Sequence, residues 1–293
     1  MCIAVTPLHP LFMAEIGGVD LARPLPAPAV DAIMEAFHRH AVLVFRDQPI
    51  TDEQQIAFSA HFGPVMTVTK YHRPGEIPRL ANDRITDISN VDHAGRILPA
   101  DDARRRHERA NMLWHTDNTF KHVPARCSLL SAREIPPEGG DTEFADMRAA
   151  YDSLPEARRR ELDDLIVEHS IVYSRQQVGF ADFTEGALEG LPPVRQVLIR
   201  RHPATGRNAL YLASHASHIV GRPVEEGRRL LRDIIAFATQ PRFVHRHRWR
   251  QGDLVLWDNR CTMHRACGYD DLGERRIMHR TTVSDEVNSV EGR

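Results

Sequence analysis

The sequence predicts a single domain with an antiparallel β core and helices packed outside it. Two observations predict this fold class. The C-terminal half contains several stretches of alternating or continuous apolar residues, and short turns with Gly or Pro separate them. No linker, internal repeat or low-complexity tract divides the 293 residues, so we expect one domain over residues 1–293.

The N-terminal part shows clear local signals. Residues 1–23 are expected to form a short strand and turns. A helix ending near His40 is indicated by apolar residues at helical spacing, namely Val30, Ile33, Met34 and Phe37. The apolar run 41–45 predicts a strand buried on both faces. Thr51 followed by Gln54 is a capping-box signature and begins a helix that Gly63-Pro64 ends.

Two segments in the middle of the chain are irregular. Residues 65–110 are rich in charge, Pro and Gly, with one strand candidate at 85–91, and residues 174–196 are again expected to be a loop. Loops of this length are often functional, so both are candidate lids over a site. The basic run 104–109 within the first is either a solvated loop or helix, which we favour, or an anion-attracting part of that lid.

The remaining elements follow the same rules. Residues 149–154 and 156–169 are expected to be helical, and residues 197–202 and 208–213 to form a hairpin. A helix carrying Leu230 and Ile234 ends before Pro241. Period-two patterns predict further strands at 243–249, 254–257 and 276–283.

Composition limits the class of function. The formal net charge is −2, so neither nucleic acid nor an anionic membrane is an expected partner. None of the four Cys lies in a Cys-x-x-Cys pair, which argues against a structural zinc site. No signal peptide and no apolar stretch of membrane-spanning length is visible, so we expect a cytoplasmic protein.

A metal site is the main functional hypothesis. His115 and Asp117 are two residues apart, so on a strand they share one face, and His264 is the best candidate for a third ligand. Two histidines and one carboxylate with open positions form the facial triad of non-haem Fe(II) oxygenases. With 17 His in the chain, however, a His-x-Asp pair also arises by chance or on a strand surface.

Two arginines follow the proposed ligands on the last strand. Arg276 and Arg280 fall on one face, whereas Arg275 falls on the other. Arg binds carboxylates bidentately, so this pair suggests two anionic groups near the metal. The alternative is that both are surface residues of an edge strand.

With these patterns, the chain resembles the Fe(II)/2-oxoglutarate-dependent dioxygenases of the taurine dioxygenase (TauD/TfdA) family. Within that family it resembles most the branch containing the (2,4-dichlorophenoxy)acetate dioxygenase. The resemblance covers nearly the whole chain. It rests on segments 7–12, 42–49, 52–58, 111–117 (Asn-Met-Leu-Trp-His-Thr-Asp), 139–144 (Gly-Gly-Asp-Thr-Glu-Phe), 146–152, 213–218 and 252–260 (Gly-Asp-Leu-Val-Leu-Trp-Asp-Asn-Arg).

The resemblance implies a double-stranded β-helix, also called a jelly roll or cupin-like core. It implies Fe(II) held by His115, Asp117 and His264, with 2-oxoglutarate and O2 as further reactants. The 2-oxoglutarate site then matches Thr142 and Arg276. Arg280 matches the arginine for the acid group of the substrate, and the remaining pocket candidates are Asn111 and Lys70.

One departure leaves an alternative open. The segment 265–274 is longer than in the relatives, so Arg275 competes with Arg276 for 2-oxoglutarate, although strand parity favours Arg276. His215 and His218 are expected to be structural or pocket-lining, and Cys261 and Cys267 to be bystanders.

The implied reaction is hydroxylation of a small anionic substrate, coupled to decarboxylation of 2-oxoglutarate to succinate. The resemblance favours an aryloxyalkanoate such as (2,4-dichlorophenoxy)acetate, cleaved to a phenol and glyoxylate; taurine or an alkylsulfonate is the alternative. Outside this class, a zinc hydrolase or a non-enzymatic β-barrel binding protein remains. Relatives are commonly homo-oligomers, which is therefore also the expectation here.

Overall fold

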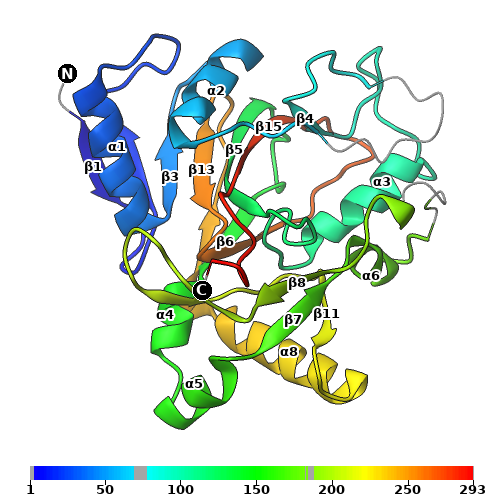
Figure 1. Ribbon diagram of the computed structural model, residues 1–293. Helices are drawn as coiled ribbons and strands as arrows, with labels where there is room; N and C mark the ends of the chain where they lie inside the picture. Colours follow the sequence, from blue (N-terminus) through cyan, green and yellow to red (C-terminus); the bar gives the residue numbers. More distant parts are fainter. Residues whose placement is uncertain (1–2, 69–77, 182, 184–187, 293) are drawn as a thin grey trace.

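The computed structural model describes residues 3–68, 78–181, 183 and 188–292. One large sheet crosses the upper half of the molecule in Figure 1, with blue strands at one end followed by orange, green, red and cyan ones. Its strand order is β1 (Ala4–Pro7), β2 (Ala14–Gly17), β3 (Val42–Phe45), β13 (Leu254–Asp258), β5 (Ala125–Glu134), β15 (Ile277–Ser284) and β4 (Thr86–Ser89). Neighbouring strands are antiparallel except for the parallel pair β2–β3.

Three smaller antiparallel sheets complete the β structure among the described residues. The first, with order β12 (Val244–His247), β6 (Thr142–Asp146) and β14 (Thr262–Ala266), carries His264. The second has the order β11 (Ala216–Ile219), β7 (Ile166–His169) and β8 (Val194–Val197). The third is the hairpin of β9 (Ile199–Arg201) and β10 (Asn208–Leu210), which lies within the predicted hairpin. These findings confirm the predicted mainly β class.

Helices lie on the outside of the sheets, as predicted. In Figure 1, α1 (Ala27–His40) and α2 (Asp52–Ser59) cover the large sheet at one end, while α4 (Met147–Asp152), α5 (Glu156–Leu162) and α8 (Val224–Ala238) lie beneath the smaller sheets. The short helices α3 (Ala103–Glu108) and α6 (Ile171–Gln176) lie on the opposite side of the molecule from α1. Single 3-10 turns are η1 (Ala60–Phe62), η2 (Arg109–Met112) and η3 (Pro241–Phe243).

The apolar core joins the two β layers that enclose the candidate site. Phe144 of β6 packs against Trp257 of β13, with ring centroids 5.6 Å apart. Both side chains are fully buried, together with Val44 and Met278 from the large sheet. The strand carrying His264 is thereby held in a fixed position relative to the large sheet.

Local signals placed several elements correctly. Helix α1 ends at His40, and all four residues of β3 are buried. Thr51 and Gln54 form both hydrogen bonds of the capping box at the start of α2. After α2, the 3-10 turn η1 continues the helical path to Phe62, and Gly63 caps it.

Three predictions were wrong in part. The helix predicted over 156–169 ends at Leu162, and Ile166 begins β7, because pairing with β8 and β11 outweighs helical periodicity in this β-branched stretch. The predicted loop 174–196 begins inside α6 and ends in β8. His115 forms an isolated bridge with His264 rather than lying on a regular strand.

The basic run 104–109 is mostly helical, in α3 and the first residue of η2. Its members are not all solvated, however. Arg105 is buried, and its Nη1 donates to the carbonyl oxygens of Leu98 and Asp271 at 2.9 and 3.1 Å. This arginine therefore fastens the segment to the loop that precedes Arg276.

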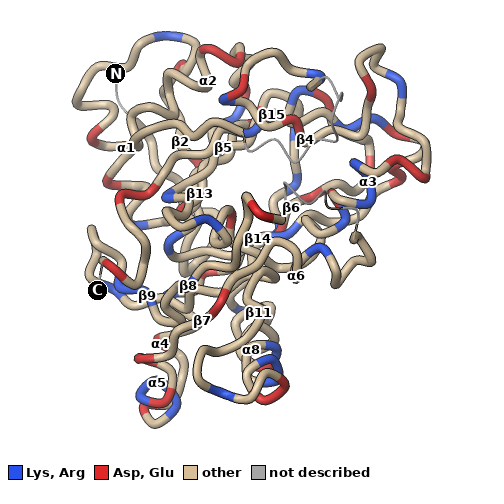
Figure 2. The backbone as a smooth tube through the Cα atoms, turned by 45° about the vertical axis from the view of Figure 1, so that its right-hand side comes forward, with Lys and Arg blue, Asp and Glu red and all other residues tan. Residues whose placement is uncertain are grey.

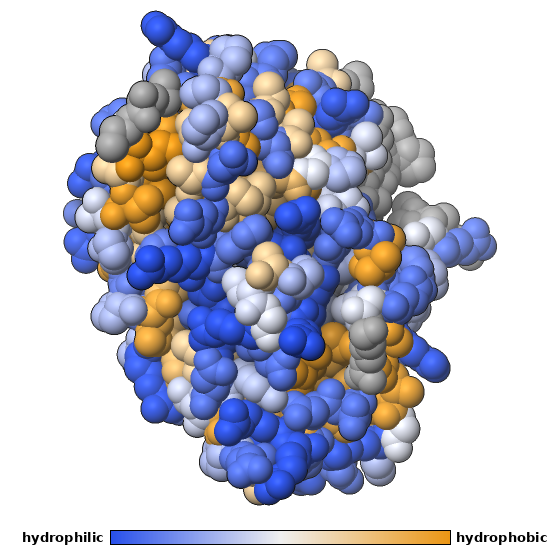
Figure 3. Space-filling view, turned by 60° about the vertical axis from the view of Figure 1, so that its left-hand side comes forward, coloured by the Kyte–Doolittle hydropathy of each residue, from blue (hydrophilic) through white to orange (hydrophobic). Residues whose placement is uncertain are grey.

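Charges of both signs are interspersed along the chain (Figure 2). On the face shown in Figure 3, hydrophobic residues form separate patches among hydrophilic ones. Within the described ranges, no helix combines the length and the apolar character needed to cross a bilayer.

A buried ion pair shapes the turn between β13 and β14. Asp258 accepts hydrogen bonds from Nε and Nη2 of Arg260 at 2.9 and 2.6 Å, and its Oδ2 lies 2.9 Å from Nε2 of His202. Burial alone would raise the pKa of Asp258, but Arg260 holds it well below its usual range. The turn positions Asn259, which contacts the candidate site.

We expect Asp258→Asn to lower the free energy of unfolding by about 3–5 kcal/mol, because it leaves Arg260 buried beside a neutral partner. Since the Asp258 pKa is depressed on folding, the difference from wild type is present at neutral pH and shrinks as the carboxyl protonates in acid. Urea denaturation measures it. Asp152→Asn, which removes an exposed ion pair with Arg207, is the matched control and should cost less than about 1 kcal/mol. Equal losses in the two variants would contradict the expectation.

Candidate metal centre and adjoining cavity

Two histidines are held side by side by the backbone. The amide N–H of His115 donates to the carbonyl of His264 at 3.0 Å, and the reverse bond measures 2.8 Å. This bridge joins the segment after η2 to β14, and the two imidazole centroids lie 4.2 Å apart. Both side chains are buried, and both Nε2 atoms lie on the side of Asp117.

Asp117 lies at the start of a turn, and its carboxylate is held from two sides. Ser128 Oγ donates to Oδ2 at 2.7 Å, and Arg280 Nη1 donates to Oδ1 at 2.7 Å. Asn259 supports both the residue and its neighbour: its Oδ1 accepts the backbone N–H of Asp117 at 3.2 Å, and its Nδ2 donates to Ser128 Oγ at 3.0 Å. The orientation of this carboxylate is therefore fixed by the large sheet and by the β13–β14 turn.

The donor set fits a divalent metal ion. One ligand atom from each of His115, Asp117 and His264 can be chosen so that all three lie within 4.8 Å of one another. His115 Nδ1 lies 2.7 Å from the carbonyl oxygen of Leu113, which can only accept, so the proton is on Nδ1 and Nε2 keeps a free lone pair.

The protonation states agree with this fit. Burial lowers the pKa of both histidines, so both are neutral at pH 7. Burial would raise the pKa of Asp117, but Arg280 and the two histidines lower it to about 2. The site thus offers two neutral imidazoles and one carboxylate, the ligands that a 2-His-1-carboxylate metal uses.

Thr142 shares a face with His264. In the β6–β14 ladder Phe144 is opposite His264, and Thr142 is two residues from Phe144, so its side chain points the same way. Trp249 Nε1 donates to Thr142 Oγ1 at 3.0 Å. Because indole only donates, the hydroxyl proton of Thr142 stays available for an acceptor such as a carboxylate.

Arg276 is buried beside the Gly139-Gly140 turn. Its Nε donates to the carbonyl oxygen of Gly140 at 3.2 Å, and Asn90 Oδ1 accepts its backbone N–H at 2.8 Å. Gly140 has a φ of +68°, and a Cβ there would come within 3.2 Å of Arg276 Nε. The turn therefore needs glycine both for its conformation and for the close approach of the guanidinium.

The structure distinguishes Arg275 from Arg276. The Arg275 side chain is 43% exposed and pairs with Glu134 at 3.0 Å, whereas Arg276 is 7% exposed. Only Arg276 is thus buried next to the segment that carries Thr142.

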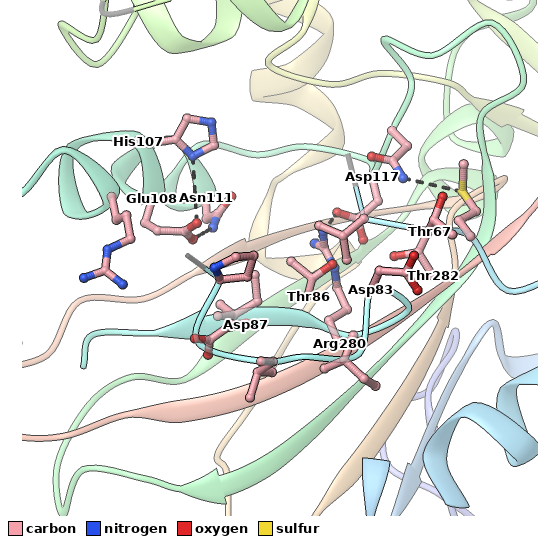
Figure 4. Close-up of a pocket in the computed structure, with 18 of the residues that line it drawn as sticks. Thr67, Asp83, Thr86, Asp87, His107, Glu108, Asn111, Asp117, Arg280 and Thr282 are labelled. Carbon is pink, nitrogen blue, oxygen red and sulfur yellow. Dashed lines mark hydrogen bonds and ion pairs between the residues drawn. The ribbon is translucent and has the colours of Figure 1, made fainter. Parts of the chain in front are cut away.

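A cavity of about 280 Å³ adjoins His115 and Asp117, two of the three proposed ligands (Figure 4). Its wall includes His115, Asp117 and Arg280. Its apolar lining includes Met66, Val68, Ile85, Ile88, Phe120 and Phe180. The cavity therefore combines a guanidinium beside the candidate metal centre with a largely apolar body, and acidic side chains such as Asp83, Asp87 and Glu108 complete its wall.

The other predicted pocket residues have different outcomes. Asn111 lines the cavity, and its Nδ2 donates to Glu108, which also lines it (Figure 4). Arg280 lines the cavity while contacting Asp117. Lys70 lies outside the described residues. Lys121, which was not predicted, also lines the cavity, and burial lowers the pKa of its ammonium group.

A second cluster of possible ligands is less suited to a metal. His202, Asp258 and Cys261 also place donor atoms within 4.8 Å of one another. Both carboxylate oxygens of Asp258 already accept hydrogen bonds from Arg260, and burial raises the pKa of the Cys261 thiol. This cluster is explained by the ion pair of the turn.

Sequence reasoning missed the residues that support Asp117. Ser128 lies on β5, a strand that was not predicted although the run Cys127–Ala132 is apolar apart from two serines. Asn259 follows the Trp257-Asp258 pair, whose pattern was noticed without a role for the amide.

Comparison with known proteins places this geometry in context. The family model described as "Taurine catabolism dioxygenase TauD, TfdA family" matches residues 4–282. The chain is 44% identical over 289 residues to an alpha-ketoglutarate-dependent 2,4-dichlorophenoxyacetate dioxygenase of Cupriavidus pinatubonensis, covering 98% of this chain and all of the relative. It is 36% identical to an (S)-phenoxypropionate/alpha-ketoglutarate-dioxygenase of Sphingobium herbicidovorans, covering 97% and 96% of the two chains.

Among solved structures, the fold is similar to that of AAD-2 in complex with Mn(II) and N-oxalylglycine. The TM-score is 0.90 at 43% identity, covering 99% of each chain. This likeness agrees with the predicted jelly-roll core.

We expect Ser128→Ala to weaken divalent metal binding by about 10- to 100-fold, because Asp117 loses a hydrogen bond that orients its carboxylate. Anaerobic calorimetry with Mn(II) measures the affinity. Ser131→Ala is the matched control, since Ser131 lies on the same strand but donates to Gln55 at 2.7 Å. An unchanged affinity in Ser128→Ala, or an equal loss in the control, would show that this hydrogen bond does not position a ligand.

Proposed function

The chain belongs to the TauD, TfdA family of dioxygenases, and on this premise we propose that it hydroxylates an aryloxyalkanoate. It is a 2-oxoglutarate-dependent dioxygenase, an oxidoreductase that uses Fe(II) and O2. The proposal adds the substrate class and the role of each residue. The observation that carries it is the largely apolar cavity in which Arg280 lies on the same wall as the candidate ligands His115 and Asp117.

We assign the metal to His115, Asp117 and His264, because their ligand atoms converge and both imidazoles are neutral. Thr142 and Arg276 are assigned to 2-oxoglutarate: the first has a hydroxyl proton to donate, and the second is a buried guanidinium for a carboxylate. Thr142 lies on β6, which pairs with the strand that carries His264, and Arg276 lies beside the Gly139-Gly140 turn that precedes β6.

Fe(II) with 2-oxoglutarate and O2 supplies the oxidising chemistry, giving succinate and CO2 while one oxygen atom enters the substrate. The protein binds and orients the reactants. Arg280 is assigned to the acid group of the substrate, which brings the adjacent carbon close to the metal centre. Asn111 lines the same wall and is assigned to the substrate pocket. Hydroxylation next to an ether oxygen gives a hemiacetal, which collapses to a phenol and glyoxylate.

An aryloxyalkanoate matches the cavity chemically. The carboxylate is complementary to Arg280, and an aromatic ring fits beside apolar residues such as Ile85, Phe120 and Phe180. Taurine also carries an anionic group, but it is a zwitterion at neutral pH, and its short carbon chain would leave this apolar lining unfilled. The relatives named for aryloxyalkanoate substrates support the same choice.

The two candidate lid segments both contribute residues to the cavity wall. Residues 65–110 contribute Met66, Val68 and Glu108 to the cavity wall, and residues 174–196 contribute Arg175 and Phe180. We propose that these two segments, within one domain over 1–293, determine which substrate body is accepted. A homo-oligomeric, cytoplasmic enzyme is part of the same proposal, and size-exclusion chromatography tests the oligomeric state.

The decisive experiment is succinate formation by anaerobically purified protein supplied with Fe(II), 2-oxoglutarate and O2. The panel contains aryloxyacetates, 2-aryloxypropionates, taurine and alkylsulfonates. We expect succinate and a phenol to rise together with the aryloxyalkanoates and to be lost in Asp117→Ala. Turnover with taurine or alkylsulfonates alone would show that the substrate is a sulfonate and not an aryloxyalkanoate. Hydrolysis of a substrate without 2-oxoglutarate would instead favour a zinc hydrolase. Failure to bind Fe(II) would favour a binding protein without enzymatic activity.

Arg276→Leu should raise the KM for 2-oxoglutarate by about 100-fold, because a buried bidentate partner of a carboxylate is lost. Arg275→Leu is the matched control and should change this KM less than about threefold, since its guanidinium pairs with Glu134 near the surface. Succinate formation at saturating substrate measures both. A larger effect in the Arg275 variant would transfer the assignment to that residue.

A further inference from the structure

A chain of hydrogen bonds leads from the second small sheet to the cavity wall. His169 Nδ1 lies 2.9 Å from Thr119 Oγ1, and Thr119 Oγ1 lies 3.1 Å from His215 Nδ1. His169 is the last residue of β7, His215 directly precedes β11, and Thr119 follows the proposed ligand Asp117 by two residues. All three residues are buried, and His215 lines the cavity.

The two imidazoles joined by these hydrogen bonds, those of His169 and His215, are both neutral. Burial lowers the pKa of His169 to about 3. Burial, together with the nearby Arg175, lowers the pKa of His215 well below its usual range. Each ring therefore carries one proton, and the position of that proton is set by the hydrogen bonds.

Counting protons shows which group donates in each of these two hydrogen bonds. The Thr119 hydroxyl has one proton and can donate to only one of the two histidines. If it donates to His169, that ring carries its proton on Nε2, which is buried and has no hydrogen-bond partner in the described part of the chain. If both histidines donate to Thr119, the hydroxyl proton itself has no acceptor among the printed contacts of the described residues.

The remaining direction leaves no buried donor without an acceptor. His169 Nδ1–H donates to Thr119, and Thr119 Oγ1–H donates to His215 Nδ1. Among the fully buried nitrogens of these two rings, only the lone pair of His169 Nε2 is then unpaired, and orphaned acceptors are tolerated more often than orphaned N–H groups. The Nε2–H of His215 has no printed acceptor either, but His215 lines the cavity. In this arrangement the proton of His215 is on Nε2, the ring nitrogen that does not face Thr119.

We propose that Thr119 and His169 are positioning residues that hold His215 in its Nε2–H form, so that a neutral imidazole presents a hydrogen-bond donor to the anionic group of the substrate. His215 and Arg280 both line the cavity, and its ring lies beside that of the proposed ligand His115, with centroids 6.3 Å apart. The inference rests on the proposed function for the identity of the substrate. The proton position itself does not depend on it.

The proton position is tested directly by NMR. Protein with 15N-labelled histidine is loaded with Zn(II) and N-oxalylglycine, and two-bond 1H–15N correlations are recorded. The His215 signals are assigned as those missing from His215→Gln. We expect a protonated Nε2 and a bare Nδ1 on His215. A protonated Nδ1 would overturn the proposal, whether or not any aryloxyalkanoate binds.

The effect on substrate is tested by calorimetry of (2,4-dichlorophenoxy)acetate binding to the same Zn(II) and N-oxalylglycine complex. Thr119→Val removes the hydroxyl, and we expect it to weaken binding by about tenfold. Thr119→Ser keeps the hydroxyl and should bind as wild type does. In a His215→Gln background, the amide N–H does not depend on Thr119, so adding Thr119→Val should change little.

The double-variant comparison separates positioning from a structural role. An equal loss on Thr119→Val in both backgrounds would mean that the hydroxyl only supports the fold, and would overturn the proposed effect on binding. If wild type does not bind the aryloxyacetate, the proposed substrate class fails. The NMR result then decides the positioning of His215 alone.

Discussion

The antiparallel bridge between His115 and His264 is the contact on which the site depends. Two backbone hydrogen bonds hold the segment after η2 against β14 and set the imidazole centroids 4.2 Å apart. Every other part of the site is positioned relative to this bridge. Asp117 reaches the same point because only one residue separates it from His115, and Thr142 reaches it through the ladder that pairs Phe144 with His264.

The charges around this bridge leave the site short of negative charge. Asp117 is the carboxylate at its centre and Glu108 lies on the same cavity wall, whereas Arg276, Arg280 and Lys121 are all buried or half-buried nearby. A divalent ion adds further positive charge. Two anionic reactants, each with its own arginine, restore the balance, so the electrostatics of the folded chain favour an enzyme whose co-substrate and substrate are both acids.

Local signals predicted much of the fold, while contacts distant in sequence determined the rest. The spacing of Val30, Ile33 and Phe37 was enough to place α1, because helical periodicity is a property of neighbouring residues. Residues 166–169 were predicted as helix, since their pairing with β8 and β11 leaves no local trace. The proposed ligands were found from their motif, and the parity of the last strand favoured Arg276. The roles of Ser128 and Thr119 depend on partners 11 and 50 residues away, which no spacing rule reports.

The short segment from His115 to Thr119 links the two β layers at nearly every residue. His115 is bridged to β14, and the hydroxyl of Thr116 donates to the carbonyl oxygens of Leu212 and Thr262. Asp117 is held by Ser128 of the large sheet, and Thr119 by His169 of a small one. Because the anchors lie on β14, β5 and β7, which belong to three different sheets, a shift of one sheet against another moves a proposed metal ligand and the cavity wall together. Metal geometry and substrate position are therefore coupled through five consecutive residues, and packing between the sheets stabilises both.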